Sequence, residues 1–159
     1  MTTVLLCIGK LKEAYWRDAA EEYLKRLRRF GPVSVVECAD LPEPKNASPA
    51  LLERLVAKEG DSLLACLQPR DYVTALCIDG KEQSSTAFAA SLARIEQSGA
   101  ARAVFVIGGS NGLSQAVVRR ADARLSFSPM TFPHQLARVL LLEQLYRARK
   151  ILSNETYHK

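Results

Sequence analysis

The sequence lacks most of the short motifs that identify a site without further evidence. Its 159 residues include two histidines and four cysteines, and no two cysteines form a Cys-x-x-Cys pair, so metal and dithiol sites have no support. No apolar run is long enough to cross a bilayer. The apolar start, Met1–Gly9, has no basic lead-in and is followed at once by Lys10 and Lys12, which is typical of a first strand rather than of a signal peptide. We therefore expect a cytoplasmic protein that binds neither a metal nor a membrane.

Length and composition predict one domain that spans residues 1–159. Apolar residues make up 48% of the chain and charged residues 25%, which is ordinary for a globular protein, and a chain of this length leaves little room for a second core. The four cysteines lie in strand-like runs or at the end of a helical pattern, so we expect buried, reduced thiols.

Positive charge is concentrated in the C-terminal part of the chain. Residues 100–159 hold nine lysines and arginines against three acidic residues, whereas the rest of the chain has a balance of −1. Such a distribution is typical of proteins with a polyanionic partner. A solvated basic face without a partner would give the same balance, so charge alone leaves both interpretations open.

Hydrophobic periodicity predicts strands that alternate with helices. The expected strands are Thr2–Cys7, Val33–Cys38, Tyr72–Ile78, Ala103–Ile107 and Arg124–Phe127. The expected helices span residues 15–30, 49–67, 84–97, 114–120 and 134–152. This alternation indicates an α/β fold with a mostly parallel sheet and helices on both faces.

A glycine-rich turn, Gly108–Gly112, follows a strand that is apolar throughout and precedes a short helix. Backbone N–H groups at such a place can face a ligand. The turn is not Gly-x-Gly-x-x-Gly, and it lacks the Lys-Ser/Thr end of a phosphate-binding loop. By itself it is also compatible with a purely structural turn.

The segment Phe127–His134 combines two prolines and two phenylalanines around small polar residues, directly after a strand. Such a loop is stiff, and its apolar side chains are suited to the wall of a pocket for a flat ring. A rigid core connector is the alternative. His134 opens the last helix, where a cap or a packing role is the simpler interpretation.

The last predicted helix is apolar on most sides, with four consecutive apolar residues at 139–142. A helix of this kind must be covered on most sides, and in a small chain a second copy can supply the cover, so we expect a homodimer. Glu143 and Arg147 have the spacing of an intrahelical ion pair. The tail, residues 154–159, is expected to fray unless a partner orders it.

Taken together, several segments resemble one protein family over the whole chain. They are Gly9–Glu13, Lys58–Gly60, Asp79–Lys81, Val106–Leu113, Leu125–Gln135, Glu143–Ala148 and the terminal Tyr157–Lys159. In this order and over this length they are similar to the ribosomal RNA large subunit methyltransferase H family of the SPOUT superfamily.

The resemblance implies a homodimeric fold with a C-terminal trefoil knot, S-adenosyl-L-methionine as methyl donor, and methylation of N3 of a pseudouridine in helix 69 of 23S rRNA on the assembled 70S ribosome. Pattern reasoning alone would have given an unknotted sheet. By position, the implied cofactor-binding residues are Leu76, Gly108, Phe127, Ser128, Pro129, Met130, Thr131 and Phe132.

Residues for the chemistry and for RNA are less well defined by the sequence. Loss of the N3 proton calls for a base or for a group that stabilises the anion, and the candidates are Glu143, Tyr157 and His158. Candidate contacts to the RNA backbone are Arg138, Arg147, Arg149, Lys150 and Lys159.

The sequence is also compared with two other classes of function, a non-catalytic binding protein and a nucleotide-dependent enzyme. A ribosome-binding assembly factor without catalysis would be small, basic and dimeric, but it would not need the stiff loop after residue 126. A nucleotide-dependent enzyme would use the glycine turn for phosphates, and the missing Lys-Ser/Thr disfavours it.

Overall fold

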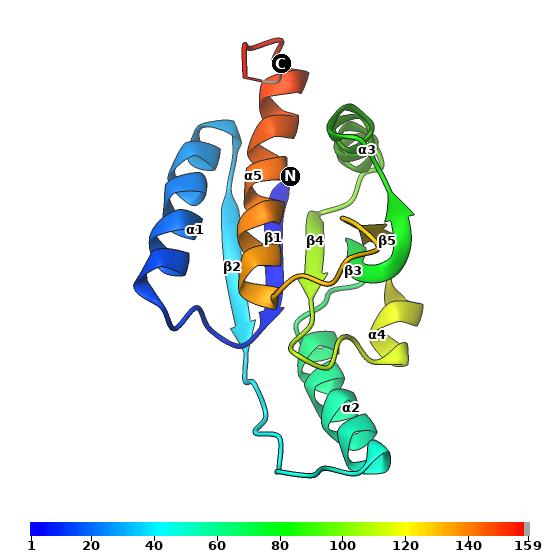
Figure 1. The fold of residues 1–159 in the computed structure, drawn as a ribbon. Helices are drawn as coiled ribbons and strands as arrows, with labels where there is room; N and C mark the ends of the chain where they lie inside the picture. Colours follow the sequence, from blue (N-terminus) through cyan, green and yellow to red (C-terminus); the bar gives the residue numbers. More distant parts are fainter. Residues whose placement is uncertain (158–159) are drawn as a thin grey trace.

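A five-stranded sheet forms the centre of the molecule, which we describe from a computed structural model for residues 1–157 (Figure 1). All strand pairings are parallel, and the strand order is β2-β1-β4-β3-β5. The strands are β1 Thr2–Ile8, β2 Val33–Cys38, β3 Asp71–Glu82, β4 Arg102–Ile107 and β5 Ala123–Ser126. The predicted α/β class with a parallel sheet is confirmed.

Helices cover both faces of the sheet, as predicted. Helices α1, α3 and α5 lie on one face and share a core with the sheet residues Leu5 and Phe105, whereas α2 and α4 pack on the opposite face against Val4 and Val104. Neighbouring residues of a strand point to opposite faces, so β1 from Val4 and β4 from Ala103 consist of apolar residues. The helices are α1 Ala14–Leu27, α2 Pro49–Ala65, α3 Ser85–Gln97, α4 Gln115–Arg120 and α5 His134–Leu152, with a 3₁₀ turn at Arg28–Phe30.

Three helices begin at the serines that the sequence marks as starts. Ser48, Ser84 and Ser114 each have extended backbone angles, and each side chain accepts a hydrogen bond from the backbone N–H three residues later. This satisfies one of the N–H groups that a helix leaves unpaired at its start. The sequence therefore located these helix starts to within a residue.

The third strand is longer than predicted. We expected Asp79-Gly80 to end it, but β3 continues to Glu82 and shifts its pairing with β5 between Leu76 and Lys81. A Cβ atom on Gly80 would lie 2.6 Å from the backbone of Leu125, so glycine is required here for close strand contact. The sequence predicted that the strand ends before this glycine, because a local pattern does not show the contact with β5.

The cysteines follow the prediction only in part. All four are free thiols, but only Cys7 is buried, whereas Cys38, Cys66 and Cys77 are partly exposed. Cys38 and Cys66 come from β2 and from the end of α2, and their sulfur atoms lie 3.8 Å apart. The expectation of four buried thiols was wrong, because β2 and the end of β3 are not covered by helices along their whole length.

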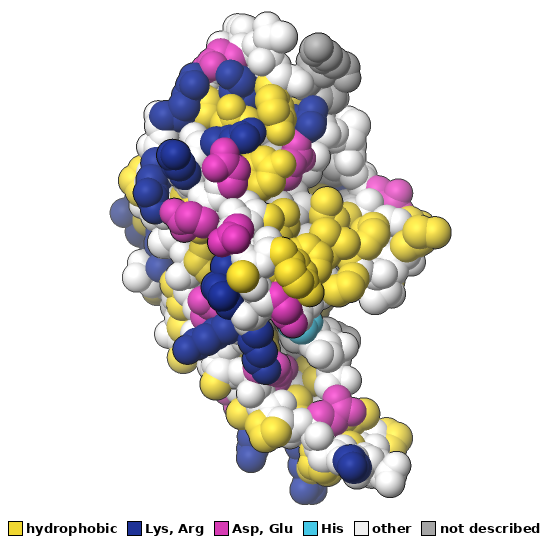
Figure 2. Space-filling model, turned by 60° about the vertical axis from the view of Figure 1, so that its left-hand side comes forward, with side chains coloured by type: hydrophobic (Ala, Val, Ile, Leu, Met, Phe, Trp, Pro, Cys, Tyr) yellow, Lys and Arg dark blue, Asp and Glu magenta, His cyan; other side chains and the backbone are white. Residues whose placement is uncertain are grey.

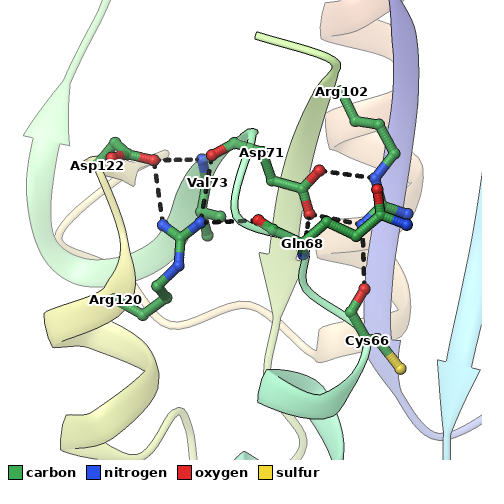
Figure 3. Close-up of polar contacts among 7 residues, drawn as sticks. All are labelled: Cys66, Gln68, Asp71, Val73, Arg102, Arg120 and Asp122. Atoms are coloured by element: carbon green, nitrogen blue, oxygen red, sulfur yellow. Dashed lines mark hydrogen bonds and ion pairs between the residues drawn. The ribbon is translucent and has the colours of Figure 1, made fainter.

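A polar network ties the amino ends of β3 and β4 together, at the end of the sheet opposite the glycine turn (Figure 3). Arg102 donates to both carboxylate oxygens of Asp71, at 2.7 and 2.5 Å, and to the carbonyl of Cys66 at 3.0 Å. Asp122 accepts from the backbone N–H of Val73 at 2.8 Å. Because Asp122 directly precedes β5, this bond sets the position in which β5 starts beside β3.

Helix α5 lies between α1 and α3 in front of the sheet (Figure 1). Its inner residues Leu141, Leu142 and Leu145 are fully buried within the chain, whereas Leu136, Val139 and Leu140 are half-buried. Part of the cover that we assigned to a second copy therefore comes from the chain itself. The homodimer and the trefoil knot stay predictions. Among the described residues, no helix combines the length and apolarity that a membrane crossing needs.

Candidate functional site

A cavity of about 750 Å³ lies at the carboxyl ends of β3, β4 and β5. In a parallel sheet, ligands bind at this end, where the chain leaves the strands in loops. The size is in the range of pockets that bury small organic ligands. Its walls come from the end of β3, from the turn after β4, from the loop after β5 and from the first turn of α5.

Most of the predicted cofactor-binding residues border this cavity. Seven of the eight line it, and Pro129 does not. The seven are Leu76, Gly108, Phe127, Ser128, Met130, Thr131 and Phe132. They come from three separate segments of the chain. The parallel topology brings these together because Leu76 lies in β3 and the other two segments directly follow β4 and β5 of the same sheet.

The glycine turn folds back tightly on itself beside the cavity. The N–H of Gly112 donates to the carbonyl of Gly109 at 3.1 Å, and Gly112 has a φ of 79°, in the left-handed region that favours glycine. A Cβ atom on Gly108 would lie 2.6 Å from the carbonyl oxygen of Gly112. Gly108 is therefore required first by the turn itself, rather than only by the space for a ligand.

The loop after β5 is held by short-range hydrogen bonds. The hydroxyl of Ser126 donates to the carbonyl of Ser128 at 3.1 Å, and the hydroxyl of Ser128 accepts from the N–H of Met130 at 3.0 Å. Met130 itself is 74% exposed. The loop thus offers a fixed backbone and two phenylalanine side chains as walls, which agrees with the stiffness predicted from its prolines.

His134 and Gln135, in the first turn of α5, also line the cavity, and sequence reasoning had read His134 as a cap or packing residue. Burial lowers the pKa of His134 below its usual value; Asp40 raises it, Arg138 lowers it further and Glu13 raises it. The imidazole is therefore neutral at neutral pH. The sequence also missed Cys77, Ile78 and Ser110 as lining residues, because nothing in their local pattern indicates which way they face.

One predicted RNA contact is contradicted by the structure. Arg138 is only 3% exposed, and its guanidinium donates to Glu37 at 3.1 Å and to the carbonyl of Gly9 at 3.0 Å. It ties α5 to the ends of β1 and β2 and does not present its charge on the surface. The sequence could not show this, because a helical arginine in an apolar pattern looks the same whether it faces solvent or a buried carboxylate.

The other basic residues of α5 that we predicted as RNA contacts are paired with acidic side chains of the same chain. Arg149 donates to Glu96 of α3 at 2.5 Å, and Lys150 is bonded to Glu155 at 2.5 Å. Arg147 pairs with Glu143 at 2.7 Å, the intrahelical pair that their spacing predicts. Lys159 lies outside the described residues. RNA contacts by Arg147, Arg149, Lys150 and Lys159 stay predictions.

Two of the three candidates for the proton lie in one cluster, apart from the cavity. Glu143 accepts from Arg147, from Gln144 at 2.6 Å and from the hydroxyl of Tyr157 at 3.3 Å. The ring of Tyr157 packs edge-on against Tyr146 and lies 4.7 Å below the guanidinium of Arg147. Burial raises the pKa of Tyr157 to about 12, and the charge of Glu143 adds to this effect. His158 lies outside the described residues.

The arrangement of the site and the comparisons with known proteins agree. The family described as "Predicted SPOUT methyltransferase" matches residues 1–158. The chain belongs to the SPOUT methyltransferase family. Members of this family use S-adenosylmethionine, and this SPOUT methyltransferase is accordingly a methyl-transferring enzyme whose cofactor is S-adenosylmethionine.

Curated relatives match this SPOUT methyltransferase from end to end. It is 50% identical to a protein of Bifidobacterium animalis subsp. lactis and 46% identical to one of Carboxydothermus hydrogenoformans, in both cases over 159 residues that cover 100% of each chain. Both relatives are named "Ribosomal RNA large subunit methyltransferase H". The family resemblance seen in the sequence is confirmed.

Solved structures support the fold. A probable methylase family protein from Haemophilus influenzae has a TM-score of 0.52 at 13% identity, over 99% of this chain and 70% of that chain. A probable methyltransferase from Bordetella pertussis has a TM-score of 0.51 at 14% identity, over 93% of each chain. At this low identity, the likeness shows a shared fold.

Among the described residues, no group of three or more histidine, cysteine, aspartate or glutamate side chains is arranged to hold a metal ion. The prediction of a metal-free protein is untested by this finding and stays a prediction.

Proposed function

We propose that this enzyme methylates large-subunit ribosomal RNA. The observation that carries the proposal is the full-length identity of 46–50% to relatives named for that activity, together with a cavity bordered by the segments that the family resemblance assigned to the cofactor. A non-catalytic assembly factor would not need such a cavity.

The cavity fits S-adenosylmethionine. Its volume of about 750 Å³ is large enough for a nucleoside with an amino-acid side chain. Phe127 and Phe132 supply apolar walls for the adenine ring, and the glycine turn supplies backbone groups close to the ligand. When bound, the cofactor supplies an electrophilic methyl group on a positively charged sulfur. In this proposal Leu76, Gly108 and the loop 127–132 hold it, with Pro129 acting through the loop's stiffness rather than by contact.

The residues of the chain have two tasks in the transfer, positioning and removal of the proton. The acceptor nitrogen must lie in line with the methyl–sulfur bond, which is a matter of geometry that the rigid loops provide. When the new N–C bond forms, the N3 proton must leave to a base or to water. Tyr157 is a neutral donor at neutral pH, so it suits stabilisation of the anion. The carboxylate of Glu143 is already bonded by three side chains and suits their orientation, and His158 remains the candidate base.

Methylation at N3 of a pseudouridine in helix 69 of 23S rRNA and action on the assembled ribosome are finer features of the proposal that rest on the family resemblance. The homodimer rests on the resemblance and on the apolar last helix, and the cytoplasmic location rests on the character of the N-terminal residues. Glu143 and Tyr157 do not border the cavity of their own chain, so in this proposal a second chain brings them to the reacting base.

Two measurements test the proposal. Calorimetric titration should show one S-adenosylmethionine site per chain, and ribosomes that lack the modification should incorporate labelled methyl groups into large-subunit rRNA. Thr131→Trp, which adds bulk at the cavity, should abolish binding, whereas Gln97→Trp, an exposed position at the end of α3, should not. Gly108→Arg should also abolish binding. Wild-type protein that fails to bind the cofactor would refute the proposal, and normal binding by both cavity variants would refute the site.

A further inference from the structure

The back of the glycine turn rests on two consecutive residues of helix α2. A Cβ atom built on Gly109 would lie 3.1 Å from the side chain of Ile8 in β1 and 3.6 Å from a carboxylate oxygen of Glu59. One built on Gly60 would lie 2.2 Å from the hydroxyl oxygen of Ser114. Ser114 caps α4 by accepting from the N–H of Val117 at 3.3 Å. Glu59 and Gly60 thus touch the segment between β4 and α4 near both of its ends.

Glu59 is unusual in this contact because a glutamate side chain is normally charged and exposed to water. It is only 3% exposed, and one carboxylate oxygen accepts from the backbone N–H of Leu41 at 3.1 Å. Burial raises the pKa of Glu59; the Leu41 bond lowers it, and the neighbouring Asp40 raises it. Burying such a group is unfavourable unless its hydrogen bonds are made, so its presence in α2 calls for an explanation beyond packing.

The same carboxylate joins two segments that are distant in the sequence. Its bond to Leu41 fixes the loop that follows β2, and its other oxygen faces the glycine turn that follows β4. Asn111 of the turn donates to Glu43 of that loop at 3.0 Å, which makes a second link between the two. The loop after β2, helix α2 and the glycine turn therefore form one connected support behind the cavity.

We propose that Glu59 is a positioning residue for the cofactor turn, acting with Gly60 to hold the backbone of residues 109–114 in the shape that borders the cavity. The inference rests on the proposed cofactor site. Glu59 does not line the cavity, so it acts through the turn and not by contact with a ligand. A smaller side chain would leave the Leu41 N–H unpaired and a void behind Gly109, and the turn would lose its support on that side.

The test compares cofactor affinity with stability in matched variants. Glu59→Ala should weaken S-adenosylmethionine binding about tenfold, because small misplacements of a binding segment are costly. Glu59→Gln keeps an acceptor for Leu41 and should bind within about twofold of wild type. Gly60→Ala, which displaces Ser114, should weaken binding like Glu59→Ala. Glu53→Ala, an exposed position of the same helix, is the control and should bind normally.

If Glu59 had only a structural role, Glu59→Ala would lower the melting temperature and leave the cofactor affinity of the folded protein unchanged. Binding is therefore measured well below the melting temperature. If Glu59→Ala does not fold, Glu59→Leu keeps the volume and takes its place. In Glu59→Ala and Gly60→Ala, the amide signals of Gly109 and Asn111 in a ¹⁵N correlation spectrum should move. The signal of the remote Gly99 should not.

The outcomes separate this inference from the proposed function. If wild-type protein does not bind the cofactor, the proposed function fails. If wild type binds, Thr131→Trp does not, and Glu59→Ala binds like wild type with unmoved turn signals, the cofactor site stands and the role of Glu59 is overturned.

Discussion

At the scale of single residues, the buried side chains of Asp71 and Arg138 are each paired with an opposite charge, and both pairs join separate segments of the chain. Asp71 joins the amino ends of β3 and β4, and Arg138 joins α5 to β1 and β2. A buried charge without its partner is strongly unfavourable. Each pair therefore favours one arrangement of the strands and helices over others.

Asp71→Ala should lower the free energy of unfolding by about 3 kcal/mol, because Arg102 and the N–H of Gln68 lose their acceptor. Urea denaturation measures this. The control is Asp79→Ala, which removes an exposed ion pair with Arg124 and should cost about 0–1 kcal/mol. Equal losses in the two variants would contradict the role of the buried pair.

The stability from Asp71 should depend on pH. Burial by itself raises the pKa of Asp71, but the hydrogen bonds from Arg102 and Gln68 outweigh it, so the pKa lies below the ordinary value of 3.8. A lowered carboxyl pKa contributes stability that is present above the unfolded pKa and is lost as the pH falls through the folded pKa. The difference between wild type and Asp71→Ala should therefore be full at pH 7 and shrink below about pH 4.

His134 should make cofactor affinity depend on pH. Its pKa lies below 6.5, so the imidazole on the cavity wall is neutral at pH 7 and becomes charged as the pH falls. A positive charge there repels the sulfonium, so affinity should decline as the pH falls below 6.5. The nearby charged groups Asp40, Glu13 and Arg138 are unchanged in His134→Asn, which should show a flatter profile. Parallel profiles for the two proteins would exclude His134 as the cause.

At the scale of elements, α5 has two ends with different surroundings. Its first turn borders the cavity, and its second half carries Glu143 and Arg147, which form a cluster with Tyr157 from the tail beyond the helix. The tail beyond α5 folds back so that Tyr157 packs on Tyr146. The sequence predicted a frayed tail, and the structure describes it as packed as far as Tyr157.

Deletion of residues 157–159 should leave cofactor affinity nearly unchanged and reduce methylation of ribosomes by about tenfold or more. Tyr157 lies away from the cavity, but a tyrosine that stacks on a base contributes about 1–3 kcal/mol. Tyr157→Phe keeps the ring and should retain most of the activity. Full activity of the truncated protein on ribosomes would show that the tail has no part in the reaction.

At the scale of the whole molecule, the surface carries an apolar area that the chain does not cover. Figure 2 shows hydrophobic side chains gathered across the middle of the molecule, on the side where α5 and the loop after β5 lie. In α5, Leu136, Val139 and Leu140 are half-buried, and Met130 in the loop after β5 is exposed. An area of this kind is typical of an interface.

Light scattering at micromolar concentration should give about 35 kDa, twice the chain mass of 17.6 kDa. Leu140→Glu places a charge on the half-buried side of α5 and should give a monomer without methylation activity. Leu51→Glu, an exposed apolar position on α2 at the other face, should remain dimeric and active. A wild-type monomer would refute the homodimer.

The sequence by itself determined the elements and the segments that carry the site. Local periodicity and turn chemistry depend on residues that are close in the chain. They account for the alternation of strands and helices, for the helix starts at serine residues and for the buried position of β4 in the sheet. The glycine turn and the stiff loop stood out for the same reason, each directly after a strand.

Only the tertiary structure decided what each polar side chain meets. Arg138 was expected to face RNA and is paired with Glu37, 101 residues away. Glu59 stood out only as part of a segment that resembles the family, and its carboxylate faces the glycine turn 50 residues later. Gly80 was read as a strand end and is instead a point of close contact with β5. These roles depend on contacts between distant segments, and a local pattern carries no information about the partner that folding brings to it.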